Sequence, residues 1–233
     1  MFVLLLPHSS HAEFDVVNKL KSVATEIATN PGGFLYDLHQ MTESLAPTRT
    51  GRRLTINSQL MPSLFPFTFA NVSGRFNVFN EHGGGIPQME VFGGYSKMVA
   101  LEFVDTDSTE GTVQGYHAGI SIVDSIHPKA RVQFGYQRSL LSGKATFKKK
   151  PIDVYGTSLS SIKVNIQEDF FIAGAEILRG NRKYMFTQMG FGLESSKIFA
   201  RIVWVGRVWD WGLAVYPEGS LVVYPTLGFK FGV

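Results

Sequence analysis

Residues 220–233 read SLVVYPTLGFKFGV, and their hydrophobicity alternates with a period of two. From position 221 to position 233 every odd residue is apolar, whereas the even residues are mostly small or polar. Because successive side chains of a strand point to opposite faces, this stretch predicts a long β-strand with one apolar face. A tilted strand that crosses a bilayer needs about 9–11 residues, whereas strands of globular proteins usually have about 5–6. The stretch is long enough to cross a bilayer.

The same period of two continues through most of the chain upstream. Runs of alternating residues predict strands at 67–79, 89–103, 115–122, 130–137, 162–177, 185–193, 198–208 and 221–233. Short turns separate most of them, which favours an all-β, antiparallel up-and-down β-barrel of about eight strands. Seven or ten strands would result if Gly93-Gly94 or the basic loop within residues 141–160 were misassigned. The apolar parity changes near Glu168, where it predicts a bulge, and again near Trp209.

The first 60 residues follow a different pattern. Residues 1–12 resemble the end of a secretory signal peptide with cleavage after Ala12. Residues 13–28 carry an apolar stripe at helical spacing, Asn30-Pro31-Gly32-Gly33 ends it, and a second short helix precedes Pro47. The chain therefore divides into a signal remnant (1–12), a helical segment with linker (13–60) and the barrel (61–233). We expect the helices at the periplasmic end of the barrel or inside its mouth; a membrane surface, another chain and simple packing on the sheet remain alternatives.

Alternation alone does not decide which face of the barrel meets water. The polar face carries many glycines and amides and charges of both signs, rather than a dense coat of lysine and glutamate. Such a face suits a narrow lumen filled by side chains, with the apolar face outside. We therefore expect inward arginines to pair with carboxylates. The polar lumen candidates are Arg75, Arg131, Arg201, Arg207, Lys230, Glu90, Glu102, Asp169 and Glu194.

The terminal strand resembles that of bacterial outer-membrane β-barrels, which ends in alternating apolar residues with an aromatic residue last. Here Val233 is last and Phe231 is the nearest aromatic residue on that face. The resemblance implies export through a signal peptide, location in the bacterial outer membrane and contact with the lipid bilayer. It also implies a structural, interaction or narrow-pore role. A soluble lipocalin-like barrel that binds a lipid or another apolar ligand inside, and a lipid-modifying barrel enzyme, are the alternatives.

Composition and motifs add few functional indications. The formal net charge of +3 is too small to indicate a nucleic-acid partner, and the chain has no cysteine. No nucleotide-binding, metalloprotease or serine-hydrolase motif occurs, so we predict no catalytic residue, no cofactor and no metal ligand. His117 and Ser121 share the polar face but are about 13 Å apart along a strand, too far to act as base and nucleophile. The oligomeric state is left open.

Overall fold

The fold is a closed antiparallel barrel of ten strands. The computed structural model describes residues 25, 29–33, 35–36, 47, 53–60, 69–81, 86–99, 109–148, 151–154, 157–179, 183–206, 208–215 and 223–232. The barrel strands are β1 (Leu54–Leu60), β2 (Phe69–Phe79), β3 (Gln88–Met98), β4 (Thr109–His127), β5 (Ala130–Phe147), β8 (Ser161–Leu178), β9 (Tyr184–Gly192), β10 (Ile198–Val205), β11 (Trp209–Val215) and β12 (Val223–Gly232). Each barrel strand pairs with the next barrel strand in the chain, so that β5 pairs with β8. β1 pairs with β12 to close the barrel.

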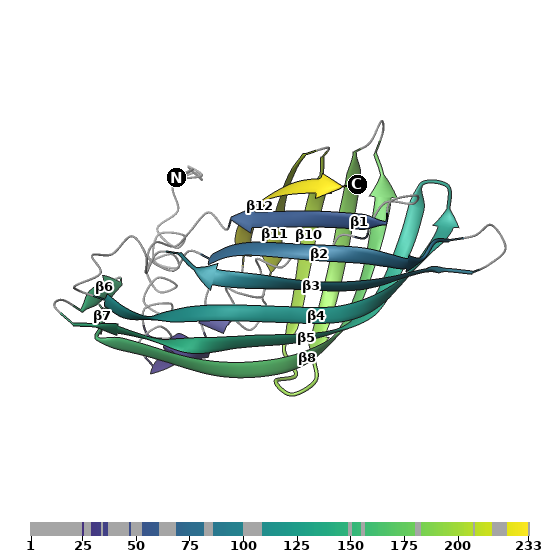
Figure 1. Cartoon of the computed structure of the whole chain (residues 1–233). Helices are drawn as coiled ribbons and strands as arrows, with labels where there is room; N and C mark the ends of the chain where they lie inside the picture. Colours follow the sequence, from purple (N-terminus) through teal and green to yellow (C-terminus); the bar gives the residue numbers. More distant parts are fainter. Residues whose placement is uncertain are drawn as a thin grey trace, which may run out of the picture.

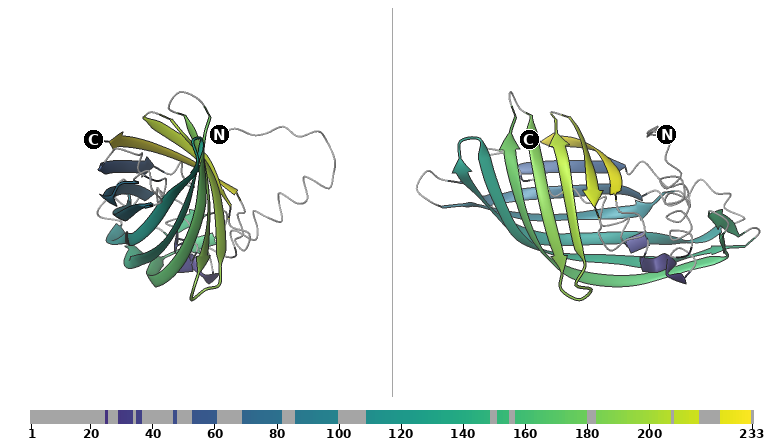
Figure 2. Two further views of the ribbon diagram at one scale, coloured as in Figure 1. Left: turned by 90° about the vertical axis from the view of Figure 1, so that its right-hand side faces the viewer. Right: turned by 180° about the vertical axis from the view of Figure 1, so that it is seen from behind.

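The two ends of the barrel differ. We call the end at which β1 begins and β12 finishes the terminal end; its turns include the short ones at 128–129, 179–183 and 206–208. At the opposite end, β4, β5 and β8 run on beyond the other strands, as Figures 1 and 2 show. A small hairpin of β6 (Ile152–Val154) and β7 (Thr157–Leu159) connects β5 to β8 there. We call this the extended end.

The predicted up-and-down barrel is confirmed, but the predicted number of about eight strands is wrong. β1 lies in the stretch that was predicted to be a linker, so the barrel begins at Leu54 rather than at residue 61. β11 was missed because only three residues separate the end of β10 at Val205 from the start of β11 at Trp209, and the expected parity change near Trp209 is this passage from one strand to the next. The basic loop contains β6 and β7, which pair only with each other.

Two predicted irregularities are absent from the described strands. Gly93 and Gly94 lie within a continuous β3, paired with β2 and β4 on either side. The pairing of β8 with β5 runs through Glu168 without a shift in register, so this position is not a bulge. The change in apolar parity at Glu168 therefore needs another explanation, which the burial of the side chains provides.

The described residues of the helical segment pack at the extended end. Thr25, Thr29, Pro31–Gly33 and Leu35–Tyr36 have helical conformation. The Asn30 side chain accepts a hydrogen bond from the Gly33 amide at 3.0 Å, so Asn30 caps a helix in which Pro31 takes the first position. The sequence Asn30-Pro31-Gly32-Gly33 thus begins a helix, in addition to ending the one before it. In the part of the chain described, no helix is both long and apolar enough to cross a membrane. The predicted signal segment, 1–12, lies outside the described residues.

Candidate functional site

The inner face of the barrel is lined largely by polar side chains. Buried polar or charged residues lie on every barrel strand from β1 to β11. They include Asn57, Asn71, Ser73, Arg75, Asn77, Gln88, Glu90, Ser96, His117, Ser121, Arg131, Gln133, Gln137, Glu176, Gln188, Arg201 and Asp210. A soluble barrel would place such groups in water, because burying them without partners costs free energy.

The outer face carries the opposite kind of side chain. Large apolar residues are exposed on all ten barrel strands. This outer apolar belt comprises Ile56, Val72, Phe76, Val91, Ile120, Phe134, Phe171, Ile177, Met189, Phe191, Ile202, Trp211, Leu213 and Leu227. Soluble monomers rarely expose a continuous apolar surface of this extent. Polar residues inside and apolar residues outside are the arrangement of barrels that span a bilayer.

An ion pair lies inside the barrel between β2 and β3. Arg75 Nη1 lies 2.7 Å from Glu90 Oε2, and both side chains are almost fully buried. Gln88 donates to Glu90 Oε1 at 2.7 Å, and the Ser121 hydroxyl donates to Glu90 Oε2 at 3.4 Å. The Arg75 guanidinium also lies over the Phe92 ring, 4.5 Å from its centroid. The arginine is thus held by a carboxylate and by an aromatic ring.

Two further inward arginines have cross-strand partners. Arg131 donates to Glu176 Oε1 from Nη2 at 2.8 Å and from Nε at 3.0 Å, and the two residues are register partners on β5 and β8. Arg201 donates from Nε to the Gln188 amide oxygen at 2.8 Å across β10 and β9. Glu176 and Gln188 were not singled out in the sequence as partners. Their parity places them on the polar face, but only the register of β8 and β9 shows which arginine each one meets.

The other lumen candidates lie elsewhere or outside the described residues. Asp169 is on the outer face of β8, and Glu194 is exposed in the turn between β9 and β10, so neither lines the lumen. This corrects their assignment. Lys230 is the register partner of Asn57 between β12 and β1, and its side chain is not described. Arg207 and Glu102 lie outside the described residues.

On the long strands, the kind of side chain on the outer face changes along the length of the strand. On β8 the even positions point inward throughout; these are Glu176 near the terminal end but Val164 and Ile162 near the extended end. Outward positions change from Ile177 and Phe171 to Asn165 and Lys163. β5 changes in parallel, from Arg131 and Gln133 inside to Leu141, Ala145 and Phe147 inside. The outer face of the strand therefore changes from apolar to polar toward the extended end, whereas apolar residues such as Ile172 and Val164 occur on the inner face in both halves.

The reversal occurs at one level of the outer surface. The Tyr136 and Phe171 rings meet there edge to face, 6.2 Å apart, at the limit of the outer apolar belt. The next outward pair toward the extended end is Arg138 and Asp169, with Nε 2.7 Å from Oδ1 and Nη2 2.8 Å from Oδ2. These two hydrogen bonds from Arg138 hold the pKa of Asp169 below its usual value. Beyond them, Lys144 and Lys163 are exposed register partners on the outer face.

An apolar core fills the interior at the extended end. Leu35 and Tyr36 of the helical segment join it and are nearly or fully buried. Its other members are Phe69, Phe92, Met98, Val113, Leu141, Ala145, Phe147, Ile162, Val164, Phe170, Ile172, Phe199 and Ala214. Gly32 lies so close to β8 that a Cβ there would be 3.1 Å from the Lys163 carbonyl oxygen. The segment thus packs inside a mouth of the barrel, but at the extended end rather than at the terminal end.

A glutamate ties the β9–β10 turn to this region. Glu168 Oε1 accepts hydrogen bonds from the Ser195 amide at 2.8 Å and from the Ser195 hydroxyl. The next residue, Ser196, has a positive φ of 57°. Glu168 is buried on the inner side of β8, at the level where the faces reverse. The carboxylate therefore connects a strand to a turn from within the apolar core, whose members Val164 and Phe170 lie on either side of it along β8.

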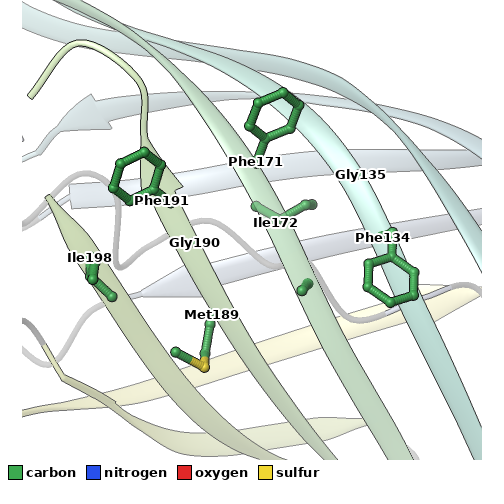
Figure 3. Close-up of a pocket in the computed structure, with 9 residues that line it drawn as sticks. Phe134, Gly135, Phe171, Ile172, Met189, Gly190, Phe191 and Ile198 are labelled. Carbon is green, nitrogen blue, oxygen red and sulfur yellow. The ribbon is translucent and has the colours of Figure 1, made fainter. Parts of the chain in front are cut away.

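An apolar hollow lies on the outside of the barrel. It has a volume of about 410 Å³ and spans the outer face from β5 to β10. Figure 3 shows Phe134, Phe171 and Met189 around it, with Gly135 and Gly190 on the strands beneath. The side chains around the hollow belong to the outer apolar belt. An apolar ligand would thus find a matching surface outside the barrel, whereas the lipocalin-like alternative requires one inside.

Comparisons with known proteins give a distant likeness among solved structures. No protein-family model matches the chain, and no curated protein matches it. Among solved structures, it is similar to the crystal structure of Ail, the attachment invasion locus protein of Yersinia pestis, with a TM-score of 0.33 and 11% sequence identity. The alignment covers 77% of this chain and 97% of that chain. Such a distant likeness says nothing about function, which must come from the geometry of this chain.

Proposed function

We propose that the chain is a bacterial outer-membrane barrel with a structural or interaction role at the cell surface. The observation that carries the proposal is the reversal of faces along β5 and β8. A strand in one solvent keeps its apolar residues on one face. A strand that leaves a bilayer and enters water must exchange the two faces where it crosses the boundary. The Arg138–Asp169 pair lies at this level, next to the end of the outer apolar belt.

Strand length supports the same boundary. Crossing a bilayer at a tilt takes about 9–11 residues. β2 and β3 have 11 residues each and β9 has 9, which suits a crossing without surplus. β4 has 19 residues, and β5 and β8 have 18 each. The surplus in these three strands is the part with polar residues outside and apolar residues inside, as expected of a projection into water.

The orientation follows from the turns. In bacterial barrels the periplasmic turns are short and the extracellular loops are longer. The connections at the terminal end span residues 80–87, 128–129, 179–183 and 206–208, and those at the extended end span 61–68, 99–108, 148–160, 193–197 and 216–222, so the longest connections lie at the extended end. We therefore place the terminal end in the periplasm and the extended end, with β6 and β7, outside the cell. The helical segment then packs inside the extracellular mouth, whereas the sequence predicted the periplasmic end of the barrel or the inside of its mouth.

The interior supports an interaction role more than transport or catalysis. An apolar core that includes Leu35 and Tyr36 occupies the extended end, and the charged groups of the other half are engaged in pairs such as Arg75–Glu90. The Ser121 hydroxyl donates to Glu90, and the His117 ring packs 6.5 Å from the Phe92 ring. A projection that stands clear of the bilayer is the part best placed to meet another molecule.

Single cysteines test both insertion and orientation, because the chain has no cysteine of its own. Lys163→Cys in the projection should react with a membrane-impermeant maleimide on intact cells. Lys129→Cys at the terminal end should react only after the outer membrane is permeabilised. Phe134→Cys in the outer apolar belt should resist the reagent until detergent or denaturant is added. Equal labelling of all three in a soluble fraction would contradict the proposal.

A further inference from the structure

A hollow at the terminal end of the barrel combines aromatic and cationic side chains. It is formed by the β8–β9 turn and the β10–β11 turn and has a volume of about 450 Å³. We call it the rim hollow; its lining is Arg179, Lys183, Tyr184, Trp204, Val205, Gly206, Trp209 and Trp211. Short turns fix its walls. The Arg179 amide donates to the Lys183 carbonyl at 2.8 Å, and the Gly206 amide donates to the Trp209 carbonyl at 3.0 Å.

The aromatic side of the rim hollow faces outward. Trp204 and Trp211 are register partners on β10 and β11, and their rings stack with centroids 4.2 Å apart and an interplanar angle of 11°. Trp209 packs on Phe229 of β12. Trp209 and Trp211 are both more than half exposed, at 53% and 54%. Tryptophan at the end of a membrane strand marks the level of the lipid headgroups, where the ring meets both hydrocarbon and water.

The cationic side lacks a carboxylate counterpart. Arg179 and Lys183 are exposed, and neither takes part in an ion pair with any described residue. The one acidic residue in the β10–β11 hairpin, Asp210, is buried on the inner face and accepts from the Gly206 amide at 3.0 Å. The rim hollow therefore presents two positive charges to the outside beside three indole rings. Guanidinium binds phosphate oxygens through two parallel hydrogen bonds, and ammonium adds a point charge.

We propose that the rim hollow binds the phosphate headgroup of an anionic phospholipid in the periplasmic leaflet. The proposal rests on the proposed function, because a headgroup reaches this level only if the barrel spans a bilayer. Arg179 and Lys183 contact the phosphate, and the stacked indoles of Trp204 and Trp211 lie against the glycerol and the upper acyl chain. A lipid without net charge gains the aromatic contact but lacks the electrostatic attraction.

The three tryptophans of the chain all line the rim hollow, so intrinsic fluorescence reports on this place alone. The full chain is refolded into phosphatidylcholine vesicles in which a fraction of the lipid carries bromine near the headgroup. Bromine is placed either on phosphatidylglycerol, which is anionic, or on phosphatidylcholine. Each basic residue near an anionic lipid favours association about fivefold. We expect the anionic lipid to quench the fluorescence with a severalfold higher association constant, and the preference to weaken in high salt.

Matched variants separate a specific contact from general attraction. Arg179→Gln combined with Lys183→Gln should reduce the preference to about one, while quenching by brominated phosphatidylcholine stays unchanged. Lys144→Gln combined with Lys163→Gln removes the same charge at the extended end and should leave the preference intact. Equal quenching by both lipids in the natural chain, or a preference that survives in the first variant, overturns the proposal. Quenching by neither lipid would instead contradict the proposal that the barrel inserts into a membrane.

Discussion

The Arg75 guanidinium and the Glu90 carboxylate approach to 2.7 Å inside the barrel, with side chains that are 1% and 0% exposed. Removal of the carboxylate alone leaves a buried charge without its partner, which typically costs about 3–5 kcal/mol. We expect Glu90→Gln to lower the free energy of unfolding by an amount near this range, measured by urea titration of the barrel in vesicles. A double variant, Arg75→Met with Glu90→Met, should be less destabilised. The Arg138–Asp169 pair on the outer face provides the control, since Asp169→Ala should cost about 0–1 kcal/mol.

The outer face of β8 offers a test of the bilayer boundary on a single strand. Phe171 and Asn165 both point outward, but Phe171 lies within the outer apolar belt and Asn165 in the projection. An arginine facing lipid costs about 2–4 kcal/mol at the midplane and less near the interface. Because Phe171 lies at the limit of the belt, we expect Phe171→Arg to cost less than the midplane value but more than Asn165→Arg, which should change stability in vesicles little. Equal effects would place both positions in the same solvent and contradict the boundary.

The carboxylate of Glu168 should stabilise the β9–β10 turn. It accepts hydrogen bonds from both the amide and the hydroxyl of Ser195. A hydrogen bond to a charged group contributes about 1.5–3 kcal/mol, so we expect Glu168→Ala to destabilise the barrel by about that amount. Glu194→Ala removes an exposed carboxylate from the same turn and should stay within about 0.5 kcal/mol. Urea titration and hydrogen exchange at Ser195 measure both effects.

The helical segment should close the extended end against ions. Leu35 is fully buried in the apolar core, whereas Thr25 is exposed. We expect Leu35→Asp to undock the segment and raise the conductance of the barrel in planar bilayers, while Thr25→Asp leaves it unchanged. Deletion of residues 13–47 should give a barrel that still inserts but is leakier or less stable. If the deletion changed neither melting nor permeability, the segment would be better interpreted as an arm for a partner.

The Arg138–Asp169 pair predicts an acid-sensitive component of stability. Its hydrogen bonds lower the pKa of Asp169 in the folded state. A lowered folded pKa means that the contribution is present above the unfolded value, which is about 3.9, and is lost as the pH falls through the folded pKa. We expect the stability of the natural chain to fall more steeply below about pH 4 than that of Asp169→Asn. Parallel curves for the two chains would contradict this.

The barrel could be predicted from alternation, but its strand count could not. β1 was not predicted because Ser58 interrupts the apolar face that Leu54 and Ile56 begin. β10 and β11 were not separated in the prediction because Trp204 and Trp209 both face outward and only a short connection lies between the two strands. β1 and β11 were missed for the same reason. A short strand can be identified only from the strands with which it pairs, and a local sequence pattern does not show this pairing.

The polar character of the lumen could be predicted from the sequence, but only some of its residues could. Arg75, Glu90, Arg131 and Arg201 lie inside, as their parity indicated. Asp169 was misplaced because the face reversal on β8 was interpreted as a bulge, which would have exchanged inside and outside beyond it. Glu176 has the parity of the polar face, but its pairing with Arg131 follows only from the register of β5 and β8. Sequence parity does not show which solvent surrounds the outer face of a strand. Along β8 this solvent changes, so parity alone could not place Asp169.

The reversal on β8 also protects the barrel against misalignment. A slip of one residue turns every side chain of a strand to the opposite face. In an ordinary membrane strand, such a slip is opposed only within the bilayer. On β8 it would bring Glu176 into lipid and at the same time move Ile162 and Val164 into water. Two independent penalties at opposite ends of the strand thus oppose the same error, so the correct alignment of β8 is selected twice.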